Sequence, residues 1–221
     1  ITGPSGSGKE VIAKAIRQAY RPAGPFVGES MANLTSTVAQ SELFGHTRGA
    51  FTGARERKGL IQSADGGVLF LDEIADAPPD IQGRLLRVLE TREVRPVGEN
   101  RAEPVDFRIV TASYKDLDAE VAAGRFRPDL QNRLVGETVV SCPLDERPLD
   151  IVPITRAVLA ERTDLGELEG LATGPDGSYE VADFLMVLLT ATYPTNVRLL
   201  VHELVLVASR YLANSERHPR L

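Results

Sequence analysis

The sequence contains very little cysteine. Cys142 is the only one among 221 residues, so no internal disulfide can form. Because Cys142 ends the apolar run 138–142, we expect a buried strand residue, with a reactive thiol as the alternative. The sequence also lacks a signal peptide and any run of about 18 apolar residues. These absences predict a protein without a membrane span, in a reducing cytoplasm.

An excess of positive charge is also missing. The formal net charge is −6, whereas a surface that coats DNA needs clustered Lys and Arg. Any contact with nucleic acid would therefore be local. The content of 43% hydrophobic and 25% charged residues is ordinary for a globular protein with a sizeable core. The length allows one large domain, or a large domain and a small one.

A glycine-rich segment at the start of the chain has the GxxxxGK pattern. Glycines let the backbone bend so that successive N–H groups face phosphate oxygens, and the lysine adds a positive charge. An apolar helical stripe follows over 11–19, so the segment leads into a helix N-terminus that favours anions. We therefore predict a nucleotide site, with an ordinary Gly/Ser turn as the alternative. Its residues are Gly3, Pro4, Ser5, Gly6, Ser7, Gly8, Lys9 and Glu10.

A second motif consists of two acidic residues that follow a short apolar run. Residues 68–71 read as a strand buried on both faces, and Asp72 and Glu73 come directly after it. Ligands of parallel sheets lie at the carboxyl ends of strands. We expect Asp72 to hold Mg²⁺ and Glu73 to polarise the water that attacks ATP. Alone, the run could also be an ordinary strand that ends in surface acids.

Strand-like and helical segments alternate through the first two thirds of the chain, which predicts a parallel α/β sheet. Only helical patterns follow, with a solvated loop over 166–178. We expect a nucleotide-binding subdomain over 1–143 and a small helical lid over 144–221. Ile1 and Thr2 read as the tail of a strand, so the sequence resembles an excised fragment. The expected strands are 26–29, 68–71, 107–112 and 138–142, and the expected helices are 10–20, 81–91, 116–123, 126–134, 150–159, 181–192 and 197–211.

Seven short motifs are spread over nearly the whole chain. They are GPSGSGKE at 3–10, SELFGH at 41–46, GAFTGA at 49–54, ADGGVLFLDE at 64–73, LLRVLE at 85–90, RFRPDLQNRL at 125–134 and YPTNVRLL at 193–200. Together they resemble one family, the AAA+ central domain of bacterial enhancer-binding proteins, which activate sigma-54 RNA polymerase. In that family a Glu follows the phosphate-loop lysine, as Glu10 does here. The resemblance implies an AAA+ P-loop NTPase with ATP and Mg²⁺ as cofactors.

The GAFTGA motif has a physical interpretation of its own. Its glycines permit a tight loop with Phe51 at the tip, and an exposed Phe suggests a binding surface. The alternative is an ordinary turn with Phe51 packed into the core. The resemblance implies that Phe51 and Thr52 contact sigma-54. Nearby His46 is expected to lie on the surface or to pack against the loop rather than to bind a metal. The expected partner-binding residues are Gly49, Ala50, Phe51, Thr52, Gly53 and Ala54.

Three arginines match functional positions of the family. Arg127 and Arg133 match two arginines that act on the site of a neighbouring subunit, where a guanidinium stabilises transition-state charge. Arg198 matches the sensor II arginine, which reaches from the lid to the nucleotide. Solvated surface arginines or a lid salt bridge are the alternatives, and nearby Arg125 could be the true match instead.

Other positions depart from the family pattern near the γ-phosphate. Tyr114 stands where the sensor I Asn is usual, although Ser113 could substitute, and Ser30 aligns with the Asn that restrains the catalytic glutamate. The lid motif is also altered, over 195–202. These changes put the hydrolysis rate in doubt but leave the binding residues in place.

We therefore expect an ATPase that forms a ring, a hexamer of identical chains, and that remodels RNA polymerase bound to sigma-54 and so opens promoter DNA. DNA contact is expected mainly through a domain absent from this chain. A degenerate ATP-binding assembly module with little turnover is the second hypothesis. A chelatase or clamp-loader relative is the third, although GAFTGA disfavours it.

Overall fold

The computed structural model describes residues 1–50, 54–161, 191–202 and 204–205. The chain divides into two compact units, and each is considered by itself. The first comprises Ile1–Gly3 and Lys9–Val140, and the second comprises Pro4–Gly8 and Ser141–Leu221. None of the described helices is long and apolar enough to cross a membrane.

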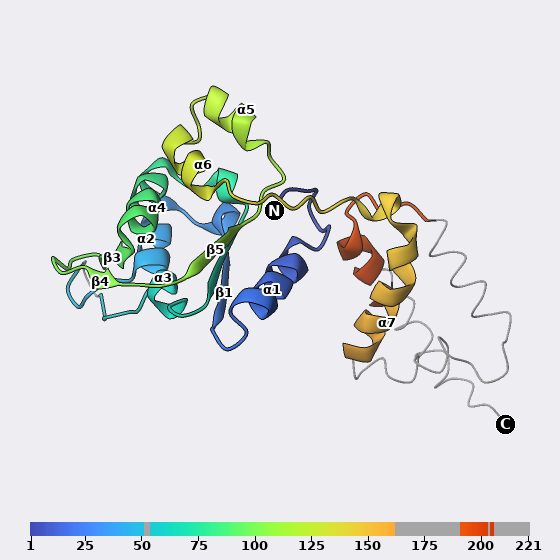
Figure 1. The fold of residues 1–221 in the computed structure, drawn as a ribbon, viewed down its shortest axis with the longest axis horizontal. Coiled ribbons are helices and arrows are strands. Elements are labelled where there is room, and N and C mark those ends of the chain that lie inside the picture. The colour runs from blue at the N-terminus through green and yellow to red at the C-terminus, as the bar shows by residue number, and fades with distance from the viewer. Residues whose placement is uncertain (51–53, 162–190, 203, 206–221) are drawn as a thin grey trace, which may run out of the picture. The chain divides into compact units, whose positions relative to one another are not determined.

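A parallel sheet forms the centre of the first unit. Its strands are β1 (Phe26–Ser30), β2 (Val68–Asp72) and β5 (Arg108–Thr111), in the order β1-β2-β5 (Figure 1). Side chains of β2 alternate between two separate cores: Leu69 and Leu71 pack on one face, and Val68 and Phe70 on the other. Burial on both faces explains the unbroken apolar run. The expected strands at 26–29, 68–71 and 107–112 are confirmed.

Helices cover both faces of this sheet. Ala13 of α1 packs into the core with Val68 and Phe70, whereas residues of α2, α3, α4 and α6 pack into the core with Leu69 and Leu71. The predicted α/β layers are therefore present. The bounds are α1 (Lys9–Tyr20), α2 (Ser36–Phe44), α3 (Leu60–Ser63), α4 (Pro79–Thr91), α5 (Leu117–Ala122) and α6 (Pro128–Leu134), with short 3-10 turns η1 (Met31–Asn33) and η2 (Ile74–Asp76).

Local chemistry explains where several helices begin. Pro79 opens α4 and Pro128 opens α6, where a missing N–H costs nothing and the fixed φ suits a helix. Asp116 caps α5, and its side chain accepts a hydrogen bond from the Asp118 N–H. The expected helices at 10–20, 81–91, 116–123 and 126–134 are thus present within a few residues of their predicted ends.

Other elements were not expected from the sequence. The helices α2 and α3 and a small antiparallel hairpin, β3 (Glu93–Val94) with β4 (Glu103–Pro104), have no strong periodic signal of their own. The two-residue strands are too short for alternation to be visible. The two strands form because Val94 of β3 is fully buried in the core beside α4.

The predicted strand at 138–142 is wrong. Val140 makes only an isolated parallel bridge to Thr2, and Cys142 is exposed rather than buried. A strand needs a neighbour along its length to satisfy its backbone groups. Within the described residues, this segment pairs with Thr2 alone, through a single hydrogen bond from the Thr2 N–H to the Val139 carbonyl. High β-propensity was therefore not sufficient to form a strand.

The described part of the second unit is helical. It contains η3 (Leu144–Glu146), η4 (Pro148–Asp150), α7 (Ile151–Glu161) and helical residues 197–202 and 204–205. Their core consists of Leu144, Ile151, Tyr193, Leu200 and Leu204. The loop expected over 166–178 lies outside the described residues, as does the helix expected over 181–192 except for 191–192, which are not helical. The boundary between 143 and 144 stays a prediction.

Candidate functional site

The glycine-rich loop has the backbone conformation that its composition predicts. Gly6 and Gly8 have φ angles of 74° and 98°, in the region that favours glycine. At Gly6 a side chain is also excluded sterically, because a Cβ would lie 2.3 Å from the carbonyl oxygen of Thr195. The two glycines therefore permit both the tight bend and the close packing of the loop.

Asn196 anchors this loop. The sequence alone did not predict that role. Its Nδ2 donates to the Ser5 carbonyl at 3.0 Å, and its Oδ1 accepts from the Leu144 N–H at 2.7 Å. Asn196 is buried and has a φ of 55°, which Asn tolerates better than most residues. The sequence signal was an Asn just before the helical run 197–202. Next to it, Arg198 lies with Nη1 3.4 Å from the Ser5 Oγ, so the predicted sensor II arginine contacts the glycine-rich loop.

Lys9 begins α1 in the first unit and is almost completely buried, with 5% of its surface exposed. Its Nζ donates to the Gly3 carbonyl at 3.1 Å and lies 3.8 Å from the Glu73 Oε1. The structure therefore brings together two residues that are far apart in the sequence and that were predicted to act on one phosphate group.

Glu73 occupies a constrained position at the end of β2. Its φ of 51° is unusual for a residue with a side chain and stores backbone strain. Its carboxylate accepts a hydrogen bond from the Tyr114 N–H at 3.2 Å, and its own N–H donates to the Asp72 Oδ1 at 3.0 Å. Burial raises the pKa of Glu73, although the Tyr114 hydrogen bond and the Lys9 charge oppose that shift. A carboxylate held this way is suited to accept a proton from water.

Three positions were expected near this carboxylate from the family pattern: Tyr114, Ser113 and Ser30. They differ in whether they contact it. Only the backbone of Tyr114 reaches Glu73, while the Tyr114 side chain is 54% exposed. The buried Ser113 hydroxyl donates to the Lys115 carbonyl, so it is engaged locally. Ser30 lies opposite Asp72 in the sheet register. Within the described residues, no side-chain amide contacts the Glu73 carboxylate.

The position of Glu10 does not favour a metal-binding role. It is exposed, and its Oε1 forms an ion pair with the Lys14 Nζ at 2.8 Å, one helical turn along α1. The Glu10 carboxylate therefore faces solvent.

Arg127 and Arg133 lie at opposite ends of α6 and engage groups near them. Arg127 forms a two-pronged ion pair with Asp129, with contacts of 3.0 and 2.6 Å, while Arg133 donates to the Leu89 carbonyl at 2.9 Å. Both are exposed. The structure therefore does not bring them to Asp72 or Glu73 within the chain. Arg125 forms a comparable pair with Glu120, at 2.6 and 2.8 Å.

The base of the GAFTGA loop is well defined, although residues 51–53 lie outside the described part. His46 pairs with Arg57 in an antiparallel bridge, and the Gly49 N–H donates to the Ala54 carbonyl at 3.3 Å. His46 is buried and its Nδ1 lies 2.8 Å from the Ser41 hydroxyl, so it packs beneath the loop as predicted. The Thr47 N–H donates to the Val97 carbonyl at 3.0 Å, which joins the loop base to the β3–β4 connection.

Comparisons with known proteins cover nearly the whole chain. Residues 1–140 match the model of the sigma-54 interaction domain. The hydrogenase transcriptional regulatory protein HoxA of Cupriavidus necator is 44% identical over 206 residues, which are 92% of this chain and 41% of that protein. The transcriptional regulatory protein GlrR of Escherichia coli K12 is 42% identical, over 91% of this chain and 44% of its own length. The chain thus spans less than half of these relatives.

Solved structures agree on the fold. NtrX from Brucella abortus, determined in complex with ADP, has a TM-score of 0.75 and 33% identity, over 92% of this chain and 43% of that one. An Hsp104 reconstruction has a TM-score of 0.66 over 96% of this chain and 41% of that one, but at 20% identity this shows the fold alone. The chain has the α/β fold of an AAA+ P-loop NTPase, as predicted.

Proposed function

Because this chain belongs to the sigma-54 interaction domain family, we propose that it binds and hydrolyses ATP and uses the energy to remodel RNA polymerase bound to sigma-54. The observation that carries the proposal is the short distance between Lys9 and Glu73: the Lys9 Nζ lies 3.8 Å from the Glu73 carboxylate. A charge that attracts phosphate and a base that activates water are thereby adjacent. The NtrX structures with bound ATP and ADP support a nucleotide as the ligand.

The residues divide the chemistry between them. The backbone of 3–8 and the Lys9 ammonium bind the phosphates, and Arg198 approaches from the lid segment. Glu73 takes the proton of the attacking water, since its carboxylate is oriented by the Tyr114 N–H and its pKa is raised by burial. These residues orient the nucleotide and water before reaction, which is where most phosphoryl-transfer catalysis originates.

Asp72 fits a role in holding Mg²⁺. It is partly exposed at the carboxyl end of β2, and one of its carboxylate oxygens, Oδ1, accepts the Glu73 N–H. The other oxygen is available to a hard cation, which prefers oxygen ligands and keeps several waters. The ion would supply charge neutralisation at the phosphates. Glu10 is turned toward Lys14 and is not needed as a ligand.

Assembly into a ring of six identical chains would complete the site. Arg127 and Arg133 are exposed on α6 and available to a neighbouring copy, although Arg127 must first leave Asp129. Exposed ion pairs of this kind contribute little to stability, because solvent and salt screen the two charges. Phosphate oxygens of an adjacent subunit's nucleotide can therefore displace the carboxylate.

Output would pass through the GAFTGA loop. Its base is hydrogen-bonded to the β3–β4 connection at Val97, and β3 itself begins two residues after the last residue of α4. Phe51 and Thr52 are proposed to contact sigma-54, with Gly49 and Gly53 allowing the bend. Truncating Phe51 or Thr52 to Ala would then leave ATP hydrolysis nearly intact while sigma-54 binding is lost.

The decisive experiment uses this chain with paired variants. Lys9→Ala should lose ATP binding, whereas Glu73→Gln should bind ATP normally and hydrolyse it about 10²-fold or more slowly. Trapping with ADP–aluminium fluoride should then retain sigma-54 on the parent and not on Thr52→Ala. Equal ATP affinity in Lys9→Ala and the parent would remove the nucleotide assignment. Retention of sigma-54 by both loop variants would move the partner surface elsewhere.

A degenerate ATP-binding assembly module is the second candidate. It is favoured by one observation, that the Tyr114 side chain is exposed and only the Tyr114 backbone contacts the Glu73 carboxylate. Steady-state turnover separates the two: tight ATP binding with turnover no faster than that of Glu73→Gln would establish the module.

A further inference from the structure

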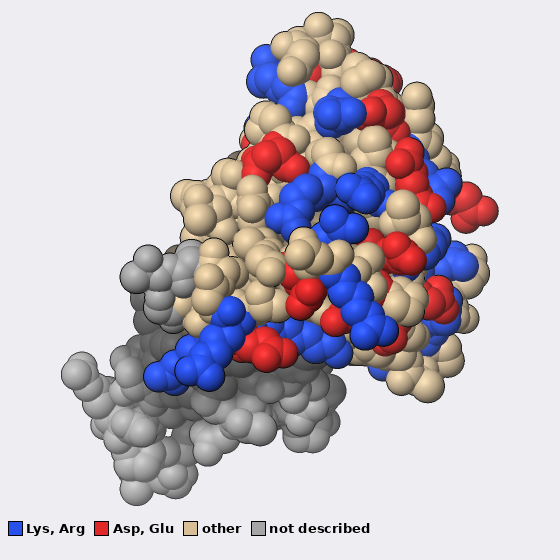
Figure 2. Space-filling view, turned by 90° about the vertical axis from the view of Figure 1, so that its left-hand side faces the viewer, with Lys and Arg blue, Asp and Glu red and all other residues tan. Residues whose placement is uncertain are grey.

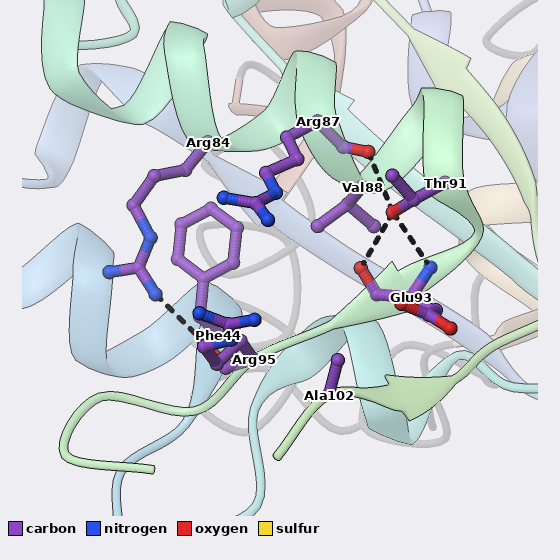
Figure 3. A pocket seen from close by; sticks show the side chains of 8 residues that line it. All are labelled: Phe44, Arg84, Arg87, Val88, Thr91, Glu93, Arg95 and Ala102. Carbon is purple, nitrogen blue, oxygen red and sulfur yellow. Dashed lines mark hydrogen bonds between the residues drawn. The ribbon is translucent and has the colours of Figure 1, made fainter. Parts of the chain in front are cut away.

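A small hollow in the first unit lies between α4, the β3–β4 hairpin and the end of α2. It has a volume of about 140 Å³. Figure 3 shows Arg84 and Arg87 on either side of the Phe44 ring, with Arg95 entering from the hairpin. The remaining lining residues are Val88, Thr91, Glu93 and Ala102.

Arg84 is held in place by several contacts. Its guanidinium lies 4.1 Å from the centre of the Phe44 ring, and it donates to the Arg95 carbonyl at 3.0 Å and to the Gln40 Oε1 at 3.3 Å. None of these acceptors is charged. Burial lowers the pKa of Arg84, although the negative charge of nearby Asp80 opposes that shift.

Arg87 and Arg95 add two further guanidinium groups. Among the residues that the structure describes, neither guanidinium has a hydrogen-bond acceptor or an ion-pair partner. Glu93 is the one carboxylate among the lining residues, so three positive charges face a single negative charge. Two of these charges are uncompensated within the hollow. A ligand with more than one negative charge would balance them.

We propose that this hollow binds a phosphate group. Arginine forks match phosphate oxygens, and Arg87 and Arg95 reach the hollow from a helix and from a hairpin. A dianion such as phosphate can accept hydrogen bonds from both guanidinium groups. The volume is below the roughly 300 Å³ at which small-molecule sites begin. The hollow therefore takes one phosphate, either free or at the end of a larger molecule that remains outside.

The surrounding surface does not favour a nucleic-acid strand. The face in Figure 2 is the side of the molecule that carries α4 and the hairpin, and there Lys and Arg are interspersed with Asp and Glu. A nucleic-acid backbone needs a continuous basic track. A single phosphate requires only the local cluster.

Bound phosphate would hold α4 and the hairpin together. Phe44 precedes Gly45, whose carbonyl accepts the Val97 N–H at 2.9 Å, so the hollow adjoins the base of the GAFTGA loop. Occupancy would stiffen this base without touching Lys9 or Glu73. The inference is independent of the proposed ATPase function.

The test is an amide NMR titration of the 221-residue chain with inorganic phosphate at constant ionic strength, which resolves this hollow from the glycine-rich loop. Saturable shifts are expected at amides 84–95. Arg87→Gln and Arg95→Gln should each weaken that binding about tenfold or more. Arg21→Gln removes an equal charge outside the hollow and should change affinity less than about twofold.

Several outcomes would overturn the proposal. Shifts confined to residues 3–10 would assign phosphate to the glycine-rich loop alone. Unchanged affinity in both hollow variants would make Arg84, Arg87 and Arg95 structural or solvated residues. Acetate binding as tightly as phosphate would show a carboxylate site instead. A DNA duplex that shifts the same amides more strongly than phosphate would replace the proposal with a nucleic-acid surface. The spectra themselves report whether each variant is folded.

Discussion

The surroundings of Glu73, at the end of β2, and of Arg127, just before α6, differ in how far each side chain is already held in position for catalysis. Glu73 is oriented by a strained backbone, by the Tyr114 N–H and by Lys9, all within one chain. Arg127 is exposed and occupied by Asp129 two residues away. One half of the proposed site is thus preorganised, while the other half must exchange its partner. Such a division makes activity depend on contact between copies of the chain.

The largest effect that tests this comparison is complementation in mixed rings. Glu73→Gln and Arg127→Ala should each be nearly inactive alone, but their mixture should regain hydrolysis. A competent site forms where an intact Glu73 meets an intact Arg127, at about one interface in four of a random mixture. Steady-state ATPase of the mixture against each variant measures this.

A matched mixture serves as the control for that experiment. Glu73→Gln mixed with the Glu73→Gln, Arg127→Ala double variant contains no intact Glu73 and should remain inactive. If the first mixture is no more active than its components, the site is built within one chain. The same comparison with Arg133→Ala, and with Arg125→Ala, identifies which arginine acts between copies.

A smaller effect should follow from restoring the two asparagines that the family has near Glu73. Tyr114→Asn combined with Ser30→Asn adds two side-chain amides where only a backbone N–H is present now, so turnover should change about tenfold, with ATP affinity within about twofold. Single-turnover hydrolysis and ATP titration separate the two quantities. A large change in affinity at constant turnover would place both residues at the phosphates rather than at the attacking water.

Releasing Arg127 should have a modest effect. Asp129→Asn removes the carboxylate that competes with phosphate, and turnover should rise by up to about fivefold, because an exposed ion pair is weak and easily displaced. Asp118→Asn, which removes a carboxylate bonded to Gln131 instead, is the control. A loss of activity in Asp129→Asn as severe as that in Arg127→Ala would show that the pair itself is needed.

The smallest effect concerns stability and pH. Because burial raises the pKa of Glu73 above 4.5 in the folded state, its contribution is fully present below pH 4.5 and is lost as the pH rises through the raised value. Glu73→Gln should therefore gain stability relative to the parent over that window in urea unfolding. Asp80 behaves oppositely: hydrogen bonds from Ser36 and Gln40 lower its pKa, so Asp80→Asn should lose relative stability as the pH rises through the lowered value.

Local sequence predicted the fold where one short segment contained the necessary information. The apolar run of β2 is buried on both faces, and the glycines of the phosphate loop have the positive φ angles that their composition predicted. The segment 138–142 was apolar in the same way but formed only an isolated bridge. Its failure shows that a strand also depends on a neighbour, which propensity does not report.

By itself the sequence determined the α/β alternation, the glycine-rich loop before α1, and the carboxylates at the end of β2, since each depends on residues adjacent in the chain. Only the tertiary structure decided which of these residues meet. It placed the Tyr114 backbone rather than its side chain on Glu73, and it anchored the glycine-rich loop through Asn196. It also gathered Arg84, Arg87 and Arg95 around Phe44. The physical reason is that backbone conformation is local, whereas charge partners, burial and strand neighbours are set by segments that packing brings together from distant parts of the chain.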